Sequence, residues 1–320
     1  MLLGANLLSI LYQVIFLLLP IYEFDEMKNY NFSPLFDENC SFTDDSILTC
    51  AIAEWLIKDH LHTESVLEGS LLRYCRFYPR PMGGYGCSFQ KWLFNPEQLY
   101  DSNMNNYHIP AKRKPYYSCG NGSAMRVSPV GWVENSIIDV METAKRSAEI
   151  THNHPEGIKG AQAVALCVYF ARIGKEKSYI KAYIENEFGY DLSMPIVEIR
   201  ERYSWRGIDE LGDGGLCQQS VPQAISCALQ SDGFEDAVRN AISIGGDSDT
   251  IGCITGGIAE ALYGIPTEIM GYAIEKYLPY RLKVVLKNFA HKYSLQQIEN
   301  YFEFHPLSNL LSEKGKKFEI

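Results

Sequence analysis

The chain has 320 residues, a formal net charge of −10 and 46% hydrophobic residues. This composition supports a full hydrophobic core, in one large domain or two smaller ones, and excludes a disordered chain. The acidic balance and the absence of a long basic run also argue against direct nucleic-acid binding, which needs clustered Lys and Arg.

Residues 1–20 form an atypical apolar segment without a single charged residue. The segment is long enough to cross a bilayer. It lacks the basic flank and small-residue cleavage site of a targeting segment, and acidic residues follow from Glu23 onward. We therefore expect a buried first helix, with a membrane segment as the alternative.

Helical periodicity dominates the rest of the chain. From Ser46 the apolar residues recur at helical spacing through Leu56. Further helices are predicted at 65–75, 136–149, 158–173, 178–187, 221–230, 234–242, 251–263, 267–276 and 280–290. Alternating strand patterns are scarce, and neither an internal repeat nor a Ser/Pro-rich linker divides the sequence. We expect one all-α domain over residues 21–320.

Two short acidic clusters stand directly before predicted helices, Thr43-Asp44-Asp45 and Asp247-Ser248-Asp249-Thr250. Four carboxylates that converge on one pocket repel one another unless some are protonated or a divalent cation neutralises them. Oxygen ligands of this kind suit Mg²⁺, Mn²⁺ or Ca²⁺. The alternative for each cluster alone is helix capping, because Asp, Ser and Thr are preferred at helix N-termini.

Two glycine-rich loops lie between the predicted helices, at residues 80–86 and 118–123. Glycine in such loops permits a positive φ or a close approach of the backbone to a ligand. The same residues also form ordinary turns, so each loop is either a ligand cradle or a turn.

Two histidines, His152 and His154, lie in a loop between predicted helices, with Pro155 at a helix start. A zinc site would need a further ligand at a suitable spacing, which the sequence lacks. We therefore interpret both histidines as hydrogen-bonding residues.

The nine cysteines include no CxxC pair. This pattern favours reduced thiols and therefore a protein of the cytoplasm.

Four motifs follow one another along the chain. They are Phe42-Thr43-Asp44-Asp45-Ser46, Gly120-Asn121-Gly122-Ser123-Ala124-Met125-Arg126-Val127, Thr151-His152-Asn153-His154-Pro155 and Gly245-Gly246-Asp247-Ser248-Asp249-Thr250-Ile251. With these motifs in this order, the chain resembles the ADP-ribosylglycohydrolase family over roughly residues 21 to 280. The resemblance implies a compact orthogonal helical bundle with two Mg²⁺ ions, or Mn²⁺, in a dinuclear centre.

The resemblance also implies roles for individual residues. The implied metal ligands are Thr43, Asp44, Asp45, Asp247, Asp249 and Thr250. The implied substrate-binding residues are Tyr85, Gly86, Gly120, Asn121, Gly122, Ser123 and His152. Glu23 matches an acidic residue that lies beside the metals in the family and can position the substrate.

Hydrolysis of the ribosyl C1″ bond of an ADP-ribosylated protein or small acceptor fits these residues. Its cationic transition state is stabilised by carboxylates, and a metal-bound water is a better nucleophile. Asp44, Asp45 or Asp249 could take the proton from that water. A magnesium phosphohydrolase is one alternative. The other is an impaired ADP-ribose-binding or structural relative, since Val14 to Pro20 replaces the family's usual Gly-Asp-x-x-Gly turn.

Overall fold

The computed structural model describes residues 28–36, 40–94, 113–209 and 212–307. Two parts of the sequence prediction, the first helix within residues 1–20 and Glu23, lie outside these residues. None of the helices in the described part combines the length and the apolar character that a bilayer crossing requires. All nine cysteines are free thiols.

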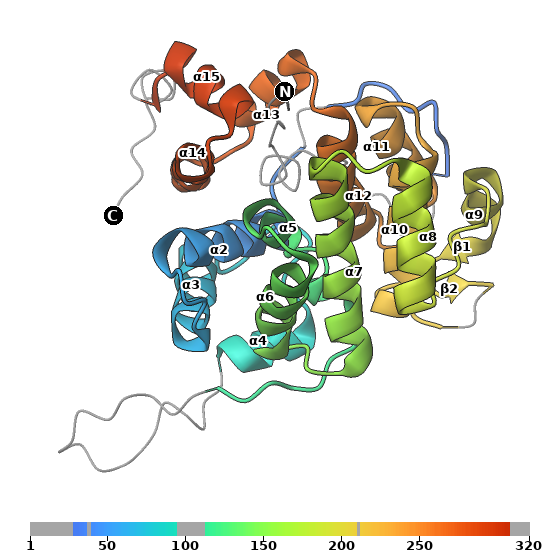
Figure 1. The fold of residues 1–320 in the computed structure, drawn as a ribbon, viewed down its shortest axis with the longest axis horizontal. Helices are drawn as coiled ribbons and strands as arrows, with labels where there is room; N and C mark the ends of the chain where they lie inside the picture. Colours follow the sequence, from blue (N-terminus) through green and yellow to red (C-terminus); the bar gives the residue numbers. More distant parts are fainter. Residues whose placement is uncertain (1–27, 37–39, 95–112, 210–211, 308–320) are drawn as a thin grey trace.

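The fold is a bundle of α-helices, which confirms the all-α prediction (Figure 1). The first half contains α2 (Asp44–Lys58), α3 (Glu64–Phe77), α4 (Cys87–Leu93), the 3₁₀ turn η2 (Asn121–Ser123), α5 (Ser128–Val133), α6 (Ile137–Glu149), α7 (Pro155–Arg172) and α8 (Lys177–Phe188). The second half contains α9 (Ile196–Arg202), α10 (Cys217–Gln230), α11 (Phe234–Ser243), α12 (Ser248–Tyr263), α13 (Thr267–Lys276), α14 (Tyr280–Tyr293) and α15 (Gln296–Phe304). One antiparallel hairpin pairs β1 (Tyr203–Ser204) with β2 (Gly207–Ile208).

Helix α7 is at the centre of the bundle and packs against α5, α6, α8, α10 and α12 (Figure 1). Its sequence reads apolar on nearly every side, as expected for a helix surrounded by others. Gly131 of α5 permits one especially close contact, since a Cβ there would lie 2.4 Å from the Ala165 carbonyl oxygen of α7. The central helix therefore fixes the relative positions of the helices that carry the predicted site.

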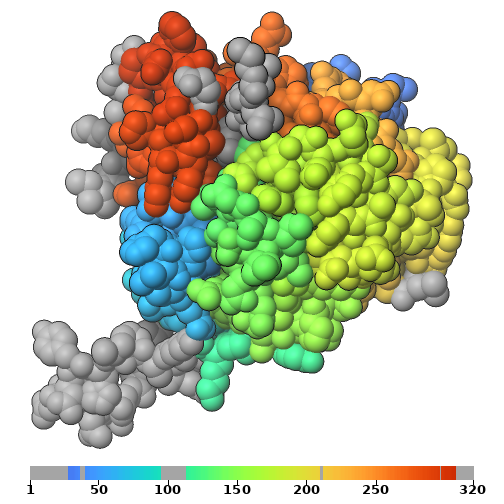
Figure 2. All heavy atoms as spheres, viewed as in Figure 1, coloured from blue at the N-terminus to red at the C-terminus, as the bar shows by residue number. Residues whose placement is uncertain are grey.

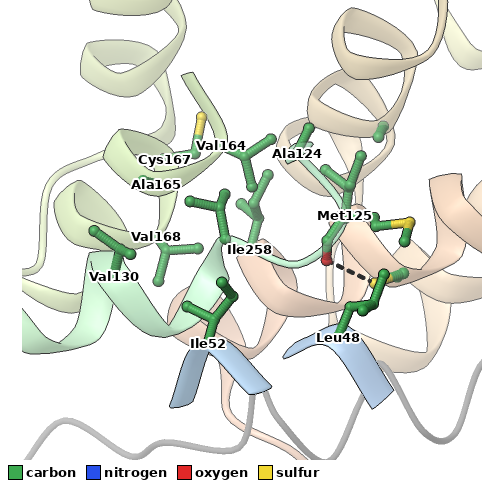
Figure 3. Close-up of a cluster of buried hydrophobic side chains, with 14 of the residues drawn as sticks. Leu48, Ile52, Ala124, Met125, Val130, Val164, Ala165, Cys167, Val168 and Ile258 are labelled. Carbon is green, nitrogen blue, oxygen red and sulfur yellow. Dashed lines mark hydrogen bonds between the residues drawn. The ribbon is translucent and has the colours of Figure 1, made fainter. Parts of the chain in front are cut away.

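Buried side chains from α2, α5, α7 and α12 meet in the cluster of Figure 3. Figure 3 shows Ile52 of α2 pointing toward Val168 of α7 and Ile258 of α12, and Leu48 of α2 pointing toward Met125. The dashed line in Figure 3 is a bond of 3.1 Å from the Cys253 thiol to the Met125 carbonyl. This packing holds the amino ends of α2 and α12 in one region.

The C-terminal helices cover the other end of α2. Figure 2 shows the surface of α14 and α15, in red, directly against the blue surface of α2 and α3. Lys292 Nζ and the Tyr293 hydroxyl both donate to the Leu56 carbonyl, at 3.1 and 2.8 Å. These hydrogen bonds hold the last turn of α2 against α14, and the first turn of α2 carries the acidic cluster.

The helices predicted within the described residues are all present, and their ends differ by a few residues. Helix α10 begins at Cys217 rather than 221, with Pro222 inside it. Cys217 N donates to the Cys119 carbonyl at 2.9 Å, so tertiary pairing supports the first turn ahead of the proline. The sequence did not predict α4, α5, α9, α15 or the hairpin, because such short elements carry little periodicity.

Candidate active site

The first acidic cluster forms the amino end of α2. Thr43 is the N-cap residue, and its hydroxyl oxygen accepts from Asp45 N at 3.3 Å and donates to Asp45 Oδ2 at 2.9 Å. Asp45 is 1% exposed. Burial and the charge of Asp249 raise the pKa of Asp45 to about 7. Thr43 therefore caps helix α2. Capping does not explain why the neighbouring Asp45 carboxylate is buried.

Asp44 belongs to the same first turn and remains half-buried. Burial, followed by the charges of Asp45 and Asp249, raises the pKa of Asp44 well above its ordinary value. Because this effect reaches across from α12, the two clusters that lie far apart in the sequence share one electrostatic environment.

The second cluster forms the amino end of α12. Asp247 occupies the N-cap position, yet its side chain makes no capping bond. Its Oδ2 instead accepts from Asn121 Nδ2 at 2.6 Å. Burial raises the pKa of Asp247 well above its ordinary value, and the charge of Asp249 raises it further. The capping interpretation thus fails for Asp247, which turns toward the glycine-rich loop.

Two positive-φ glycines, Gly245 and Gly246, turn the chain into Asp247, with φ of 75° and 65°. A Cβ on Gly246 would lie 2.4 Å from Tyr203 Cε1 in the hairpin. A side chain there would displace the hairpin or the turn, so glycine is required for this approach. The glycines thereby set the direction of the Asp247 carboxylate.

Two other glycines approach the carboxylates directly. A Cβ on Gly83, which has φ of 75°, would lie 3.6 Å from Asp249 Oδ2 and 4.0 Å from Thr43 Cγ2. A Cβ on Gly215 would lie 3.8 Å from Asp247 Oδ2. Both glycines leave room beside the acids that any larger residue would fill. Neither residue was predicted from the sequence to be part of the site, although Gly83 belongs to the loop at residues 80–86.

The loop at residues 118–123 packs onto this arrangement. Asn121 N donates to the Gly215 carbonyl at 2.9 Å, and Asn121 Nδ2 also reaches Ser220 Oγ at 3.2 Å. Gly120 and Gly122 are half-buried, whereas Ser123 is fully buried and donates to the Gly157 carbonyl at 2.7 Å. Gly120 and Gly122 are therefore the accessible part of the predicted cradle, and Ser123 fastens it to α7.

His152 lies beneath the same loop. A Cβ on Gly122 would lie 3.0 Å from His152 Nε2, so a larger residue at this position would require the histidine ring to shift. Burial and the charge of Arg126 lower the pKa of His152 well below its ordinary value, which keeps the ring neutral. Thr151 Oγ1 accepts from Arg126 Nη2 at 2.8 Å and lies 2.8 Å from His152 Nδ1. In the tautomer in which Thr151 donates to Nδ1, the Nε2 proton of His152 faces the loop.

Tyr85 and Gly86, predicted to form a wall of the site, lie at the start of α4. Tyr85 is buried, and its hydroxyl donates to the Tyr78 carbonyl at 2.8 Å. Gly86 is exposed at the N-cap of α4. Of the residues in this loop, Gly83 is the one that lies close to the Asp249 carboxylate.

A cavity of about 180 Å³ is lined by Lys177 and Lys181, among other residues. None of the predicted site residues lines it.

The sequence of the chain also identifies its protein family. The sequence profile of the ADP-ribosylglycohydrolases matches residues 18–293. The chain belongs to the ADP-ribosylglycohydrolase family. It is therefore a hydrolase that acts on glycosidic bonds of ADP-ribose. This confirms the resemblance inferred from the four motifs.

Similar proteins support the assignment to the ADP-ribosylglycohydrolases. The chain is 29% identical over 270 residues to human ADP-ribosylhydrolase ARH3, covering 70% of this chain and 71% of the relative. It is 28% identical over 274 residues to the mouse ARH3, covering 71% of each. It is 24% identical over 149 residues to the ADP-ribosylarginine hydrolase Tri1 of Pseudomonas putida, covering 46% of this chain and 39% of the relative.

A solved structure shares the fold of this ADP-ribosylglycohydrolase. It belongs to an ADP-ribosylglycohydrolase-related protein complex and superposes with a TM-score of 0.57, at 21% identity. The match covers 91% of this chain and 93% of that chain. The likeness shows that the helical arrangement is that of the family.

The acidic residues fit a divalent cation in their chemistry. Asp45 Oδ1 is buried and has no hydrogen-bond partner among the described residues. The carboxylates of both helix starts also raise one another's pKa. However, within residues 28–36, 40–94, 113–209 and 212–307 no three His, Cys, Asp or Glu side chains are grouped closely enough to hold an ion. The carboxylates therefore affect one another electrostatically without being gathered into a metal-binding group in the described part of this structure.

Proposed function

We propose that this family member hydrolyses the C1″ glycosidic bond of an ADP-ribosylated protein or small acceptor with two divalent cations, Mg²⁺ or Mn²⁺, bound at the acidic clusters. The observation that supports it best is the orientation of Asp247, which leaves its capping position and directs a buried carboxylate toward Asn121. Burying several mutually repelling carboxylates is unfavourable, and a cation offsets that free energy.

The proposed ligands are the residues named by the motifs, Thr43, Asp44, Asp45, Asp247, Asp249 and Thr250. When bound, the cations would neutralise the carboxylates and lower the pKa of a bound water. Hydrogen bonds within the protein already orient two of these ligand side chains, Asp45 and Asp247. Thr43 holds one oxygen of Asp45 and leaves the other without a partner in the described structure, while Asn121 orients Asp247.

The proposed substrate contacts come from the loop at residues 120–123 and from His152. Gly120 and Gly122 let a diphosphate approach the backbone closely. The neutral His152 can offer its Nε2 proton at Gly122 as a hydrogen-bond donor. Holding the distal ribose in this way fixes C1″ relative to the acidic clusters, which lowers the entropic part of the barrier.

In the bond-breaking step the carboxylates have two proposed roles, stabilising positive charge and removing a proton from water. As the C1″ bond breaks, positive charge develops on the ribose, and the nearby carboxylates stabilise it. Asp44, Asp45 and Asp249 are the candidates for removing a proton from the attacking water. We further propose that the enzyme works in the cytoplasm, where its free thiols stay reduced.

The test is release of ADP-ribose from peptides modified on arginine or on serine, with Mg²⁺ and with EDTA. We expect Mg²⁺-dependent release by the wild-type protein and almost none by Asp247→Asn. A matched control is Asp139→Asn, because Asp139 also lies in the first turn of a helix but is exposed. Absence of release in every condition contradicts the proposal. Phosphate release from a simple ester would favour a phosphohydrolase, and ADP-ribose binding without turnover would favour an impaired relative.

A further inference from the structure

One exposed aromatic side chain lies beside the acidic clusters. The chain has four tryptophans, of which Trp55, Trp92 and Trp132 are at most 5% exposed. Trp205 is 42% exposed. Trp205 is therefore the one tryptophan of the four whose ring reaches the surface.

The ring lies close to a proposed metal ligand. A Cβ on Gly215 would lie 3.8 Å from Asp247 Oδ2 and 3.9 Å from Trp205 Cη2. The tip of the indole and the carboxylate are therefore no further apart than these two distances added together. Gly215 lets both approach the same point, and a side chain at this position would fill the space between them.

The backbone of Trp205 is held firmly in this place. Trp205 forms the turn of the hairpin between β1 and β2, which lies beside α9 and α10 (Figure 1). Its carbonyl accepts from Gly214 N at 2.7 Å, and the buried Tyr203 donates from its hydroxyl to the Gly214 carbonyl at 2.8 Å. Tyr203 also packs on Gly246, the residue before Asp247. The hairpin is thus clamped onto the turn that positions the carboxylate.

The glycine-rich loop also lies close to Gly215. The nearest atoms to a Cβ on Gly120 include the Gly215 carbonyl oxygen and His152 Nε2, both at 3.8 Å. Gly215 is therefore near the loop as well as near Trp205 and Asp247. If the loop holds the ADP-ribose part of the substrate and the acidic clusters hold C1″, the group attached to C1″ is within reach of the indole.

We propose that Trp205 is a specificity-determining residue whose indole packs against the acceptor group of the substrate and favours a flat, delocalised acceptor such as the guanidinium of arginine. The inference rests on the proposed function. An indole face attracts a planar cation, and it offers little to the small hydroxyl side chain of serine.

The experiment compares wild-type protein, Trp205→Ala, Trp205→Phe and the control Tyr280→Ala on ADP-ribosylarginine and ADP-ribosylserine peptides. Tyr280 is also exposed, at 46%, and begins α14, away from the hairpin (Figure 1). For Trp205→Ala we expect kcat/KM to fall by about tenfold on the arginine peptide, with no more than about a twofold change on the serine peptide. Trp205→Phe should recover most of the loss, and Tyr280→Ala should behave as wild type.

A binding measurement separates this inference from the proposed function. By calorimetry, free ADP-ribose should bind wild type and Trp205→Ala equally, while the arginine peptide should bind the inactive Asp247→Asn more tightly than Asp247→Asn/Trp205→Ala. Equal losses on both peptides, no loss on either, or weaker ADP-ribose binding would overturn the role of Trp205 and leave the proposed function standing. A wild-type protein that neither binds nor cleaves any of these ligands would refute the proposed function itself.

Discussion

Asn121 donates a hydrogen bond of 2.6 Å to the carboxylate of Asp247 across a sequence separation of 126 positions. This contact joins the glycine-rich loop, which we propose binds the substrate, to the acidic cluster at the start of α12. Asp247 stands at the N-cap of this helix, yet its side chain makes no capping bond. Binding and catalytic parts of the proposed site are thus mechanically connected.

Replacing Asn121 with alanine removes the donor that orients Asp247. We expect Mg²⁺ or Mn²⁺ affinity to fall by about 10–100-fold, the range observed when a residue that supports a metal ligand is lost. The measurement is calorimetric titration of the metal. Asn186→Ala is the matched control, because Asn186 is exposed on α8. An unchanged metal affinity in Asn121→Ala would show that Asp247 needs no support.

Replacing Asp249 with asparagine removes one charge from the carboxylate group that raises the pKa of Asp44, Asp45 and Asp247. Because the repulsion is present when no cation is bound, we expect Asp249→Asn in EDTA to be more stable than wild type by about 1 kcal/mol, and inactive. Urea unfolding with EDTA measures this. A less stable metal-free variant would indicate that Asp249 has a structural role instead.

Glu260 of α12 is 1% exposed, and neither carboxylate oxygen has a hydrogen-bond partner in the described part of the chain. Burial raises the pKa of Glu260 well above its ordinary value of 4.5. The folded state therefore keeps a proton that the unfolded state releases above this value. Stability should fall by about 1.4 kcal/mol per pH unit from pH 4.5 up to the folded-state pKa.

Glu260→Gln cannot ionise, so its stability relative to wild type should increase as the pH rises from 5 to 8. Urea unfolding at several pH values gives this difference directly. Glu142→Gln, at an exposed position of α6, should show no such trend. A constant difference between Glu260→Gln and wild type across this range would mean that Glu260 is ionised in the folded protein.

Gly131→Ala tests the contact between α5 and α7. The added Cβ would lie 2.4 Å from the Ala165 carbonyl oxygen and 2.7 Å from Val168 Cβ, so we expect a loss of about 1–3 kcal/mol. Gly69→Ala is the matched control in α3, where a Cβ would have no neighbour within 4 Å. It should gain about 0.5–1 kcal/mol from helix propensity. Thermal unfolding of both variants decides between these effects.

The helices could be predicted from the sequence where their apolar pattern runs over several turns, as in α6 and α7. The short helices α4 and α5 could not, because a turn or two of helix leaves no clear period and their stability comes from packing. The same limit applies to the hairpin at Tyr203–Ile208, whose strands have two residues each.

The acidic clusters could be found from the sequence because each combines several carboxylates in a few positions. Gly215 and Trp205 could not be assigned to the site, since only the folding of the hairpin against Gly246 brings them to Asp247. The burial of Tyr85, whose ring packs next to Phe89, also depends on the tertiary fold. The spacing of acidic residues in the sequence indicates candidate metal ligands. Which other residues lie next to those ligands depends on tertiary packing.

The most direct measurement of the central claim is calorimetric titration of Mn²⁺ into the wild-type protein and into Asp247→Asn, with Asp139→Asn as the control for loss of an aspartate charge. Two ions should bind to each wild-type chain, with weaker or incomplete binding in Asp247→Asn and wild-type behaviour in Asp139→Asn. If wild type binds no divalent cation, or if Asp247→Asn binds it equally well, the two acidic clusters do not form the metal centre proposed for them.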